Sequence, residues 1–381
     1  MTAAMQNTLN RESTIDFAPE RWAGIKETYR KFWAHELKRP IIQMAFEGRE
    51  PGRPEPELPF NRFSSWYSLD VPPEEIIDRW DYYLSRVEFY GDAFPNMWLN
   101  FGPGVLAAFL GSELHAAEST TWFSPKEKLE VGEYNFQLDK NNVWLKRVID
   151  LAEAAGKFWQ GNVQVGTTDL GGTLDVLSTF RPSEDLLLDL YDYPEEVKRQ
   201  TWALHEPWFQ AYDLIQQSLG KYNPGYTCWT PIFSEEPYYM LQCDFCYMIG
   251  TDMFDEFVKP ELAAACKRVK NAFYHLDGPG ALPHLDSLLE IEELAGVQWV
   301  FGAGNGCIQD WLDVYERIHK AGKLLQVAGP GASDPGKDSY RALDAVADRL
   351  GTAEGIYYTC NWQPTENKDK VLRFLEDYGA L

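Results

Sequence analysis

The stretch Ala272-Phe-Tyr-His-Leu-Asp-Gly-Pro-Gly-Ala-Leu-Pro-His284 opens with an apolar run that is typical of a buried strand. The Gly278-Pro-Gly280 sequence then ends any regular element. Residues two apart in a strand point to the same face, so His275 and Asp277 are expected side by side at the C-terminal end of this strand. In α/β barrels, that end of each strand carries the chemistry. The structural alternative is a strand-end histidine followed by an aspartate that forms the turn.

Seven further apolar runs resemble this one, and each ends in Gly, Pro, Asn or a functional side chain. Helical segments separate the last four runs, an alternation that indicates a parallel sheet. Eight such strands favour a closed (β/α)8 TIM barrel over an open sheet. We therefore predict an N-terminal helical extension over residues 1–38 and one barrel over residues 39–381. The predicted strands are 39–46, 96–101, 161–167, 226–233, 272–277, 296–301, 323–327 and 355–360.

The composition excludes several classes of function. The 381 residues carry a formal net charge of -23, which disfavours binding to nucleic acid or to an anionic membrane. No apolar run approaches 18 residues, and the first ten residues lack the apolar core of a signal peptide. The six cysteines are scattered, as in proteins whose thiols stay reduced. We expect a cytoplasmic protein.

Several polar side chains fall at the predicted strand ends, where a barrel would bring them to one mouth. Imidazole, carboxylate and thiolate together suit Zn²⁺, so His275, Asp277 and Cys360 are the predicted zinc ligands. The alternative for Cys360 is a small buried hydrophobe, as unmodified cysteines often are. The other residues at these ends are Asn100, Asp169, Glu235, Glu236 and Asn305.

Two carboxylates are candidates for general acid and base catalysis. Glu236 is expected to follow the fourth strand, and because adjacent side chains point apart, only one of Glu235 and Glu236 could enter the site. Asp169 follows the third strand in a glycine-rich stretch, where it could equally shape a turn.

Parts of the chain resemble the uroporphyrinogen decarboxylase superfamily. The helix-opening block Cys243-Asp-Phe-Cys-Tyr-Met-Ile-Gly-Thr-Asp-Met-Phe-Asp-Glu-Phe-Val-Lys-Pro-Glu261 is similar to that of the family, and His275-Leu-Asp-Gly and residues 308–322 are similar to its later βα units. Asn100-Phe-Gly-Pro-Gly and Asp169-Leu-Gly-Gly-Thr-Leu-Asp175 fit its other branches. The resemblance covers roughly residues 40–378 and implies a (β/α)8 barrel.

The resemblance implies two chemistries, and the residues separate them. The haem-pathway decarboxylase carries an Arg-Gln-Ala-Gly-Arg run after its first strand, whereas this chain reads Gln43-Met-Ala-Phe-Glu-Gly-Arg49. The zinc methyltransferase branch carries His-x-Cys after a mid-barrel strand and a cysteine near the last strand. Here His275-Leu-Asp277 replaces the first pattern and Cys360 matches the second. The aspartate makes the site harder, which suits an oxygen or amine leaving group better than a thiol.

The function expected from this resemblance is methyl transfer between a small methylated compound and a corrinoid carried by a partner protein. The compound would be a methyl ether, a methylamine or a betaine, and the family also suggests a homodimer. Two alternatives stay open: a decarboxylase or other lyase acting on a small carboxylate through Asp169 and Glu236, and a non-catalytic binding protein. The predicted substrate-binding residues are Asn100, Trp229, Trp299, Asn305 and Trp362.

Overall fold

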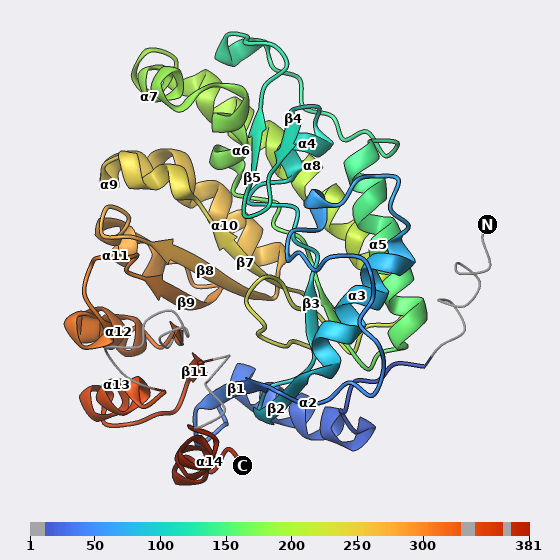
Figure 1. Cartoon of the computed structure of the whole chain (residues 1–381). Coiled ribbons are helices and arrows are strands. Elements are labelled where there is room, and N and C mark those ends of the chain that lie inside the picture. The colour runs from blue at the N-terminus through green and yellow to red at the C-terminus, as the bar shows by residue number, and fades with distance from the viewer. Residues whose placement is uncertain (1–11, 329–339, 361–366) are drawn as a thin grey trace.

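The computed structural model describes residues 12–328, 340–360 and 367–381, and the fold is mixed α/β (Figure 1). The largest sheet has seven strands in the spatial order β2-β1-β11-β10-β9-β8-β7. Neighbouring strands in it are parallel except for β2, which pairs antiparallel with β1 at the edge. The strands are β1 (Ile41–Glu47), β2 (Val87–Gly91), β7 (Tyr238–Gln242), β8 (Asn271–Asp277), β9 (Leu294–Val300), β10 (Leu324–Ala328) and β11 (Ile356–Thr359).

Two smaller sheets complete the β-structure. Strand β3 (Asn96–Trp98) pairs in parallel with β6 (Gln164–Gly166), and β4 (Glu113–Ala116) forms an antiparallel pair with β5 (Thr121–Ser124). Within the described residues, no ladder joins β1 to β3 or β6 to β7. The expected ring of eight parallel strands is therefore observed as a six-strand parallel arc and a separate two-strand parallel arc.

The predicted strand over residues 226–233 is wrong. This segment makes an isolated antiparallel bridge between Tyr226 and Ser234, and the strand, β7, begins later, at Tyr238. Local bonds compete with a ladder here, because the Thr227 hydroxyl donates to the carbonyls of Thr230 and Ile232 at 3.2 and 2.8 Å. The residues of β7 are all buried, as expected for a strand covered on both faces.

Helices follow the strands and cover the outside of the larger sheet, and Figure 1 shows α10 to α14 beside β8 to β11. None of the described helices is long and apolar enough to cross a membrane. The α-helices are α2 (Pro19–Trp33), α3 (Pro73–Ser85), α4 (Leu106–Phe109), α5 (Val143–Trp159), α6 (Thr173–Phe180), α7 (Ser183–Asp192), α8 (Pro194–Leu219), α9 (Thr251–Met253), α10 (Lys259–Arg268), α11 (Leu285–Leu289), α12 (Leu312–Lys320), α13 (Ala342–Leu350) and α14 (Lys368–Asp377).

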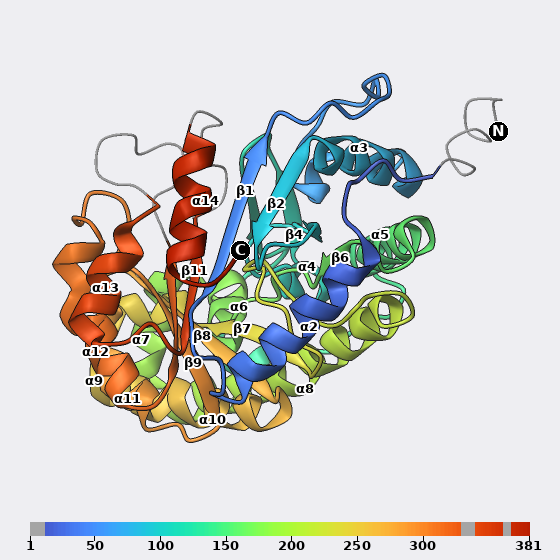
Figure 2. The ribbon, with the colours of Figure 1, turned by 90° about the horizontal axis from the view of Figure 1, so that it is seen from below.

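Helix α2 lies across the ends at which β7 and β8 begin (Figure 2). Its last residue, Trp33, donates its indole Nε1 to the carbonyl oxygen of Phe233 at 2.9 Å. The Trp33 ring also meets the rings of Tyr238 and Phe273, with centroids 5.8 and 5.6 Å apart. These aromatic contacts bury the N-terminal ends of the strands, so the opposite, C-terminal ends are left to form a site.

The register of the larger sheet brings five polar side chains to one level. Gln242 pairs with His275, His275 with Gln298, and Gln298 with Gln326. Gln326 in turn pairs with Tyr357 on β11. Residues paired across a sheet point to the same face, so these side chains share one face and form a polar layer next to the C-terminal strand ends.

Candidate metal and substrate site

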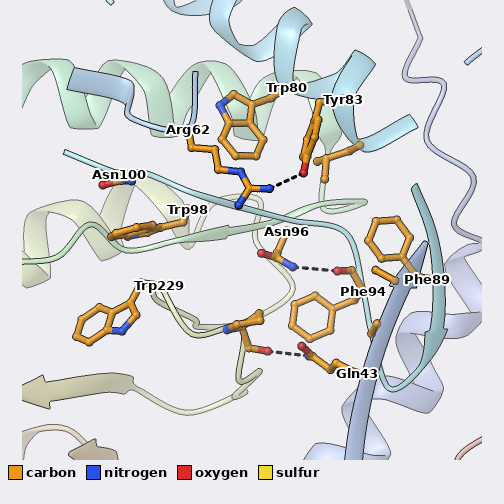
Figure 3. A pocket seen from close by; sticks show the side chains of 14 residues that line it. Gln43, Arg62, Trp80, Tyr83, Phe89, Phe94, Asn96, Trp98, Asn100 and Trp229 are labelled. Atoms are coloured by element: carbon orange, nitrogen blue, oxygen red, sulfur yellow. Dashed lines mark hydrogen bonds between the residues drawn. The ribbon is translucent and has the colours of Figure 1, made fainter. Parts of the chain in front are cut away.

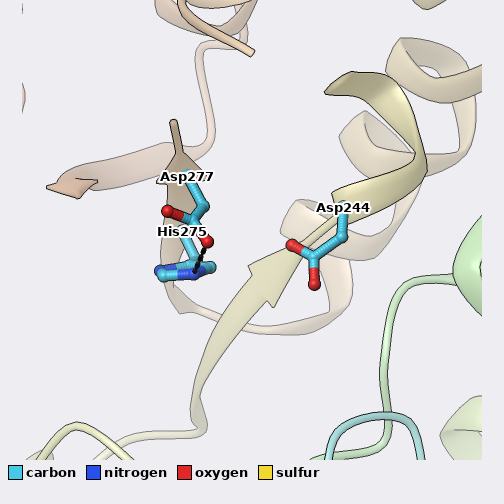
Figure 4. Close-up of side chains that lie close together, drawn as sticks. All are labelled: Asp244, His275 and Asp277. Carbon is cyan, nitrogen blue, oxygen red and sulfur yellow. Dashed lines mark ion pairs between the residues drawn. The ribbon is translucent and has the colours of Figure 1, made fainter. Parts of the chain in front are cut away.

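Asp244, His275 and Asp277 form a compact group at the C-terminal ends of two neighbouring strands (Figure 4). His275 and Asp277 belong to β8, and Asp244 opens a 3-10 helix, η3 (Asp244–Met248), directly after β7. One possible ligand atom from each residue lies within 4.8 Å of the others. Asp244 and Asp277 are exposed and His275 is partly buried, so the group can be reached from solvent.

The orientation of the His275 ring is fixed by its neighbours. Its Nδ1 hydrogen-bonds to Oε1 of the buried Gln298, so Nδ1–H is the donor and Nε2 is left for another partner. Nε2 lies 3.8 Å from a carboxylate oxygen of Asp277. Burial lowers the pKa of His275, but the bonds to Asp277 and Gln298 and the charges of Asp244 and Asp277 outweigh it and raise the pKa above its ordinary value.

Asp244 is held by the turn that follows β7. The backbone N–H of Phe245 donates to the carboxylate of the partly buried Asp175 at 2.8 Å, which anchors the start of η3. Asp244 is exposed on one side, but the protein atoms packed around its carboxyl group keep water from the rest of it. This desolvation and the nearby carboxylates of Asp175 and Asp277 raise the pKa of Asp244 to about 6, although His275 acts in the opposite direction. A positive ion between the three side chains would relieve this repulsion.

A fourth titratable group, Asp169, lies beyond the end of β6 and is almost fully buried. Its carboxylate accepts hydrogen bonds from the backbone N–H of Gly171 at 2.8 Å and from Nε2 of Gln242 at 3.2 Å. Burial nevertheless raises the pKa of Asp169 to about 7, and the charge of Asp244 adds to this effect. Asp169 can therefore exchange a proton near neutral pH, as a catalytic acid or base must.

An aromatic cavity of about 260 Å³ lies between β1, β3 and α3, on the side where β1 and β3 do not pair (Figure 3). Trp229 connects this cavity to the group that contains His275. Its ring lines the cavity and also meets the His275 ring edge-on, with centroids 6.1 Å apart. Asn100, which follows β3, lines the cavity too. The other side chains that enclose it include Arg62, Trp80, Tyr83, Phe89, Phe94 and Trp98.

The structure brings His275 and Asp277 together as expected, but it does not bring Cys360 to them. Cys360 is buried and its thiol interacts with the Tyr358 side chain two residues earlier. The Tyr358 ring meets Phe374 of α14, so this face of β11 points into the layer between the sheet and the helices. Burial there raises the pKa of the Cys360 thiol to about 12, which disfavours a thiolate ligand. The third side chain beside His275 and Asp277 is that of Asp244, where we had predicted Cys360.

Glu236 also lies away from the group. It precedes β7 instead of following a strand, and its carboxylate pairs with exposed Lys270 at 3.2 Å. Its neighbour Glu235 pairs with Arg30 of α2 at 2.9 Å. The prediction for Glu236 depended on the strand at 226–233, and with that strand absent both glutamates belong to the end of the sheet that α2 covers.

Two predicted substrate-binding residues, Trp299 and Asn305, are not part of the cavity wall. Trp299 is buried on the face of β9 opposite to Gln298 and packs against Trp311, with centroids 5.2 Å apart. Asn305 is exposed and closes its own turn by donating Nδ2 to the Phe301 carbonyl at 2.7 Å. Trp362 lies outside the described residues.

Sequence reasoning missed Asp244 and most of the cavity. Asp244 lies in the quoted 243–261 block, and the signal that could have found it is the apolar run 238–242 immediately before it. The misplaced fourth strand hid this signal. Trp80 and Tyr83 follow the helical spacing of α3 and could not be told from ordinary core residues, while Trp98 was inside a predicted strand.

The donor set fits a divalent metal ion. One imidazole nitrogen and two carboxylates are ligands that zinc accepts, and three protein ligands leave coordination positions for a substrate. Gln298 would act as the outer partner that metal-binding histidines usually have on their second nitrogen. No thiolate takes part, so the site is harder than a cysteine-containing zinc site.

Comparison with known proteins gives a likeness in structure only. No family model matches the chain, and no curated protein matches its sequence. A solved structure, a methyltransferase from Methanosarcina mazei, superposes with a TM-score of 0.60. The match covers 93% of this chain and 99% of that one at 14% sequence identity. At this identity, the likeness establishes that the two chains share a fold.

Proposed function

We propose that this protein transfers a methyl group between a small methylated compound and a corrinoid carried by a partner protein. The observation that carries the proposal is the group of Asp244, His275 and Asp277, which lies at strand ends beside a cavity of small-molecule size. The fold shared with a methyltransferase supports it. We also propose that the two parallel arcs together form a (β/α)8 barrel whose C-terminal mouth holds this site.

The proposed metal site has Asp244, His275 and Asp277 as ligands, with zinc as the first candidate. A divalent ion bound there would supply Lewis acidity to the heteroatom that loses the methyl group. Gln298 keeps the proton of His275 on Nδ1 and so presents the lone pair of Nε2 toward the two carboxylates. Asp277 and Asp244 contribute the negative charge that favours a cation.

The reaction balances with the groups available. In the direction of demethylation, the bond between the methyl carbon and its oxygen or nitrogen breaks, and a bond between that carbon and a reduced corrinoid cobalt forms. The heteroatom keeps the electron pair, and an ether oxygen then takes up a proton. Asp169, whose pKa is about 7, is the residue near the group that can hold such a proton at neutral pH.

The test combines metal analysis with a transfer assay. The purified protein is expected to contain close to one divalent metal ion per chain. Mixed with reduced cobalamin and a panel of methyl ethers, methylamines and betaines, it should form methylcobalamin with at least one donor. His275→Ala should abolish both metal binding and transfer while the far-ultraviolet circular dichroism spectrum stays unchanged. A metal-free protein that transfers no methyl group from any donor would contradict the proposal.

Asp169 supports a second candidate, the decarboxylation of a small carboxylate without a corrinoid. A buried carboxyl group with a pKa of about 7 can protonate the carbon that loses carbon dioxide. Glu236, which we had paired with Asp169 for this chemistry, lies at the other end of the sheet. Release of carbon dioxide that depends on Asp169 and not on His275 would favour this candidate over methyl transfer.

A further inference from the structure

We propose that the aromatic cavity beside Trp229 binds a single-ring aromatic compound that carries a carboxylate group. One part of this proposal rests on the proposed function, namely that the methyl ether of such a compound is the methyl donor. Binding itself depends on neither a metal nor a corrinoid. Three features of the cavity support it, namely its size, its walls and its charge.

The size of the cavity limits the ligand to one ring. About 260 Å³ is just below the range of about 300–1,000 Å³ that small-molecule sites usually have. A corrinoid macrocycle cannot enter such a space, so the cavity is a site for the smaller reactant. A single aromatic ring with two small substituents is of a size that such a space can hold.

The walls are built for a flat ligand. Trp80 and Tyr83 meet at 88° with ring centroids 5.7 Å apart, and both extend from α3 toward the cavity (Figure 3). Phe94 and Trp98 approach from the segment that contains β3. Aromatic side chains arranged in this way gain most from a ring that can stack on one face and meet others edge-on.

The charge of the cavity selects an anion. Among the described residues that line it, Arg62 alone has a side chain that is ionised at neutral pH, and no aspartate or glutamate is present. Arg62 donates Nη2 to the Tyr83 hydroxyl at 3.1 Å, which directs the guanidinium along the cavity (Figure 3). A guanidinium holds a carboxylate through charge-assisted hydrogen bonds, and it repels a methylammonium ion.

The position of Arg62 relative to Trp229 orients the ligand. The two side chains come from different segments and lie on different sides of the cavity in Figure 3. A carboxylate on Arg62 would leave the far edge of the ring at Trp229, which touches His275. A methoxy group on that edge would then lie on the side of the cavity nearest to His275, the member of the proposed metal group that Trp229 meets. This geometry separates an aromatic methyl ether from the methylamines, for which the cavity offers no counter-charge.

The experiment is calorimetric titration of the full chain with three probes: 4-methoxybenzoate, the neutral 4-methoxybenzamide and glycine betaine. We expect 4-methoxybenzoate to bind most tightly. Arg62→Gln should weaken its binding about 10–100-fold, as loss of a charged hydrogen bond does, and should change the binding of the neutral amide less than about 2-fold. Arg62→Lys should give an intermediate loss for the carboxylate.

The control variant is Arg199→Gln, which removes an exposed arginine that pairs with Glu196 on α8. It should bind all three probes as the wild type does. The proposal is overturned if 4-methoxybenzoate gives no binding heat at millimolar concentrations, if Arg62→Gln weakens both aromatic probes equally, or if glycine betaine binds more tightly than 4-methoxybenzoate. Binding of 4-methoxybenzoate without methylcobalamin formation would support the cavity assignment and count against methyl transfer alone.

Discussion

The Trp229 ring meets the His275 ring edge-on, with centroids 6.1 Å apart and ring planes at 89°. Trp229 is also part of the cavity wall, so one side chain touches both the space for a ligand and the histidine proposed to bind a metal. Edge-to-face aromatic pairs contribute about 0.5–1.5 kcal/mol beyond the area they bury. If the Trp229 ring moves when a ligand binds, its contact with the His275 ring will change.

Asp244→Asn is expected to lower the affinity for zinc by about 100-fold or more, because loss of a ligand costs at least as much as loss of an outer partner. Asparagine keeps the size of the side chain but removes the negative charge. Isothermal titration with zinc, or competition with a chelating dye, measures the change.

The matched variant for this prediction is Cys360→Ala. Its thiol faces Tyr358 on the helix side of β11, so zinc affinity should stay within about 2-fold of the wild type. Equal zinc loss in both variants would mean that the ligand set is not the group at β7 and β8.

Gln298→Leu is expected to weaken zinc binding about 10–100-fold without touching the metal, since it removes the acceptor that holds His275 Nδ1–H. Gln298→Glu keeps an acceptor at this place and should retain more of the affinity. The two variants can be compared by the same zinc titration. An identical loss in both would indicate a packing effect at this buried position and not the loss of the hydrogen bond.

The sequence predicted the strands whose apolar runs are uninterrupted. The run 272–277 and the runs of β9, β10 and β11 were placed to within a few residues, because Gly or Pro marks their ends. The fourth strand was misplaced because residues 226–233 are as apolar as 238–242. In the folded chain, the Thr227 hydroxyl donates to the Thr230 carbonyl, and the Pro231 carbonyl accepts a hydrogen bond from Nε2 of Gln43. These bonds hold the segment in turns instead of a strand, and the sequence does not show them.

For the candidate site, the sequence could predict that two residues of one strand lie on the same face. It could not predict which residue of another strand lies beside them. His275 and Asp277 followed from strand periodicity alone. The choice between Asp244 and Cys360 depended on which strand each one follows and on which face its side chain lies. Cys360 comes two residues after Tyr358, so both side chains lie on the same face of the chain at β11. This face packs against α14, and nothing in the sequence marks it as the outer face. The cavity brings β1, α3 and the 229–231 segment together, and such contacts have no local pattern.

Asp169 should make stability depend on pH. Its folded pKa of about 7 exceeds the ordinary value of 3.8, so between these values the folded protein retains a proton that the unfolded chain has released. The contribution of Asp169 to stability therefore falls as the pH rises from about 4 to about 7 and is constant above.

The Asp169→Asn variant removes this titration. Relative to the wild type, its free energy of unfolding should rise across the same window, by up to about 4 kcal/mol. Urea denaturation at half-unit pH intervals measures the difference. Parallel curves for the two proteins between pH 4 and 7 would show that Asp169 titrates normally.

Trp229→Ala should weaken the binding of 4-methoxybenzoate by about 10-fold, because it removes aromatic contact and opens the wall toward His275. Trp229→Phe should lose less, since it keeps a ring at the same place. Trp122→Ala is the control, because Trp122 is exposed on β5 and stacks on His115 outside the cavity. Titration calorimetry should give wild-type affinity for this control. A loss equal to that of Trp229→Ala would contradict the assignment of the binding site.

Gly171→Ala is expected to destabilise the protein by about 2–4 kcal/mol. Gly171 has a φ of +77°, which side-chain-bearing residues rarely adopt, and an added Cβ would lie 2.8 Å from the Cα of Gly104. The two glycines are where the loops after β6 and β3 cross, next to the bond from Val105 N–H to the Asp169 carbonyl. The substitution should therefore also displace Asp169 and lower its pKa, because a displaced carboxyl group becomes less buried.

The opposite result is expected for Gly24→Ala in α2. Gly24 is exposed inside the helix and an added Cβ would meet nothing within 4 Å, so alanine should stabilise the protein by up to about 1 kcal/mol. Thermal and urea denaturation of both variants give the two values with one method. If Gly171→Ala were as stable as Gly24→Ala, the loops after β3 and β6 would not be in close contact. The backbone contacts that hold Asp169 in its position near Asp244 and His275 would then be contradicted.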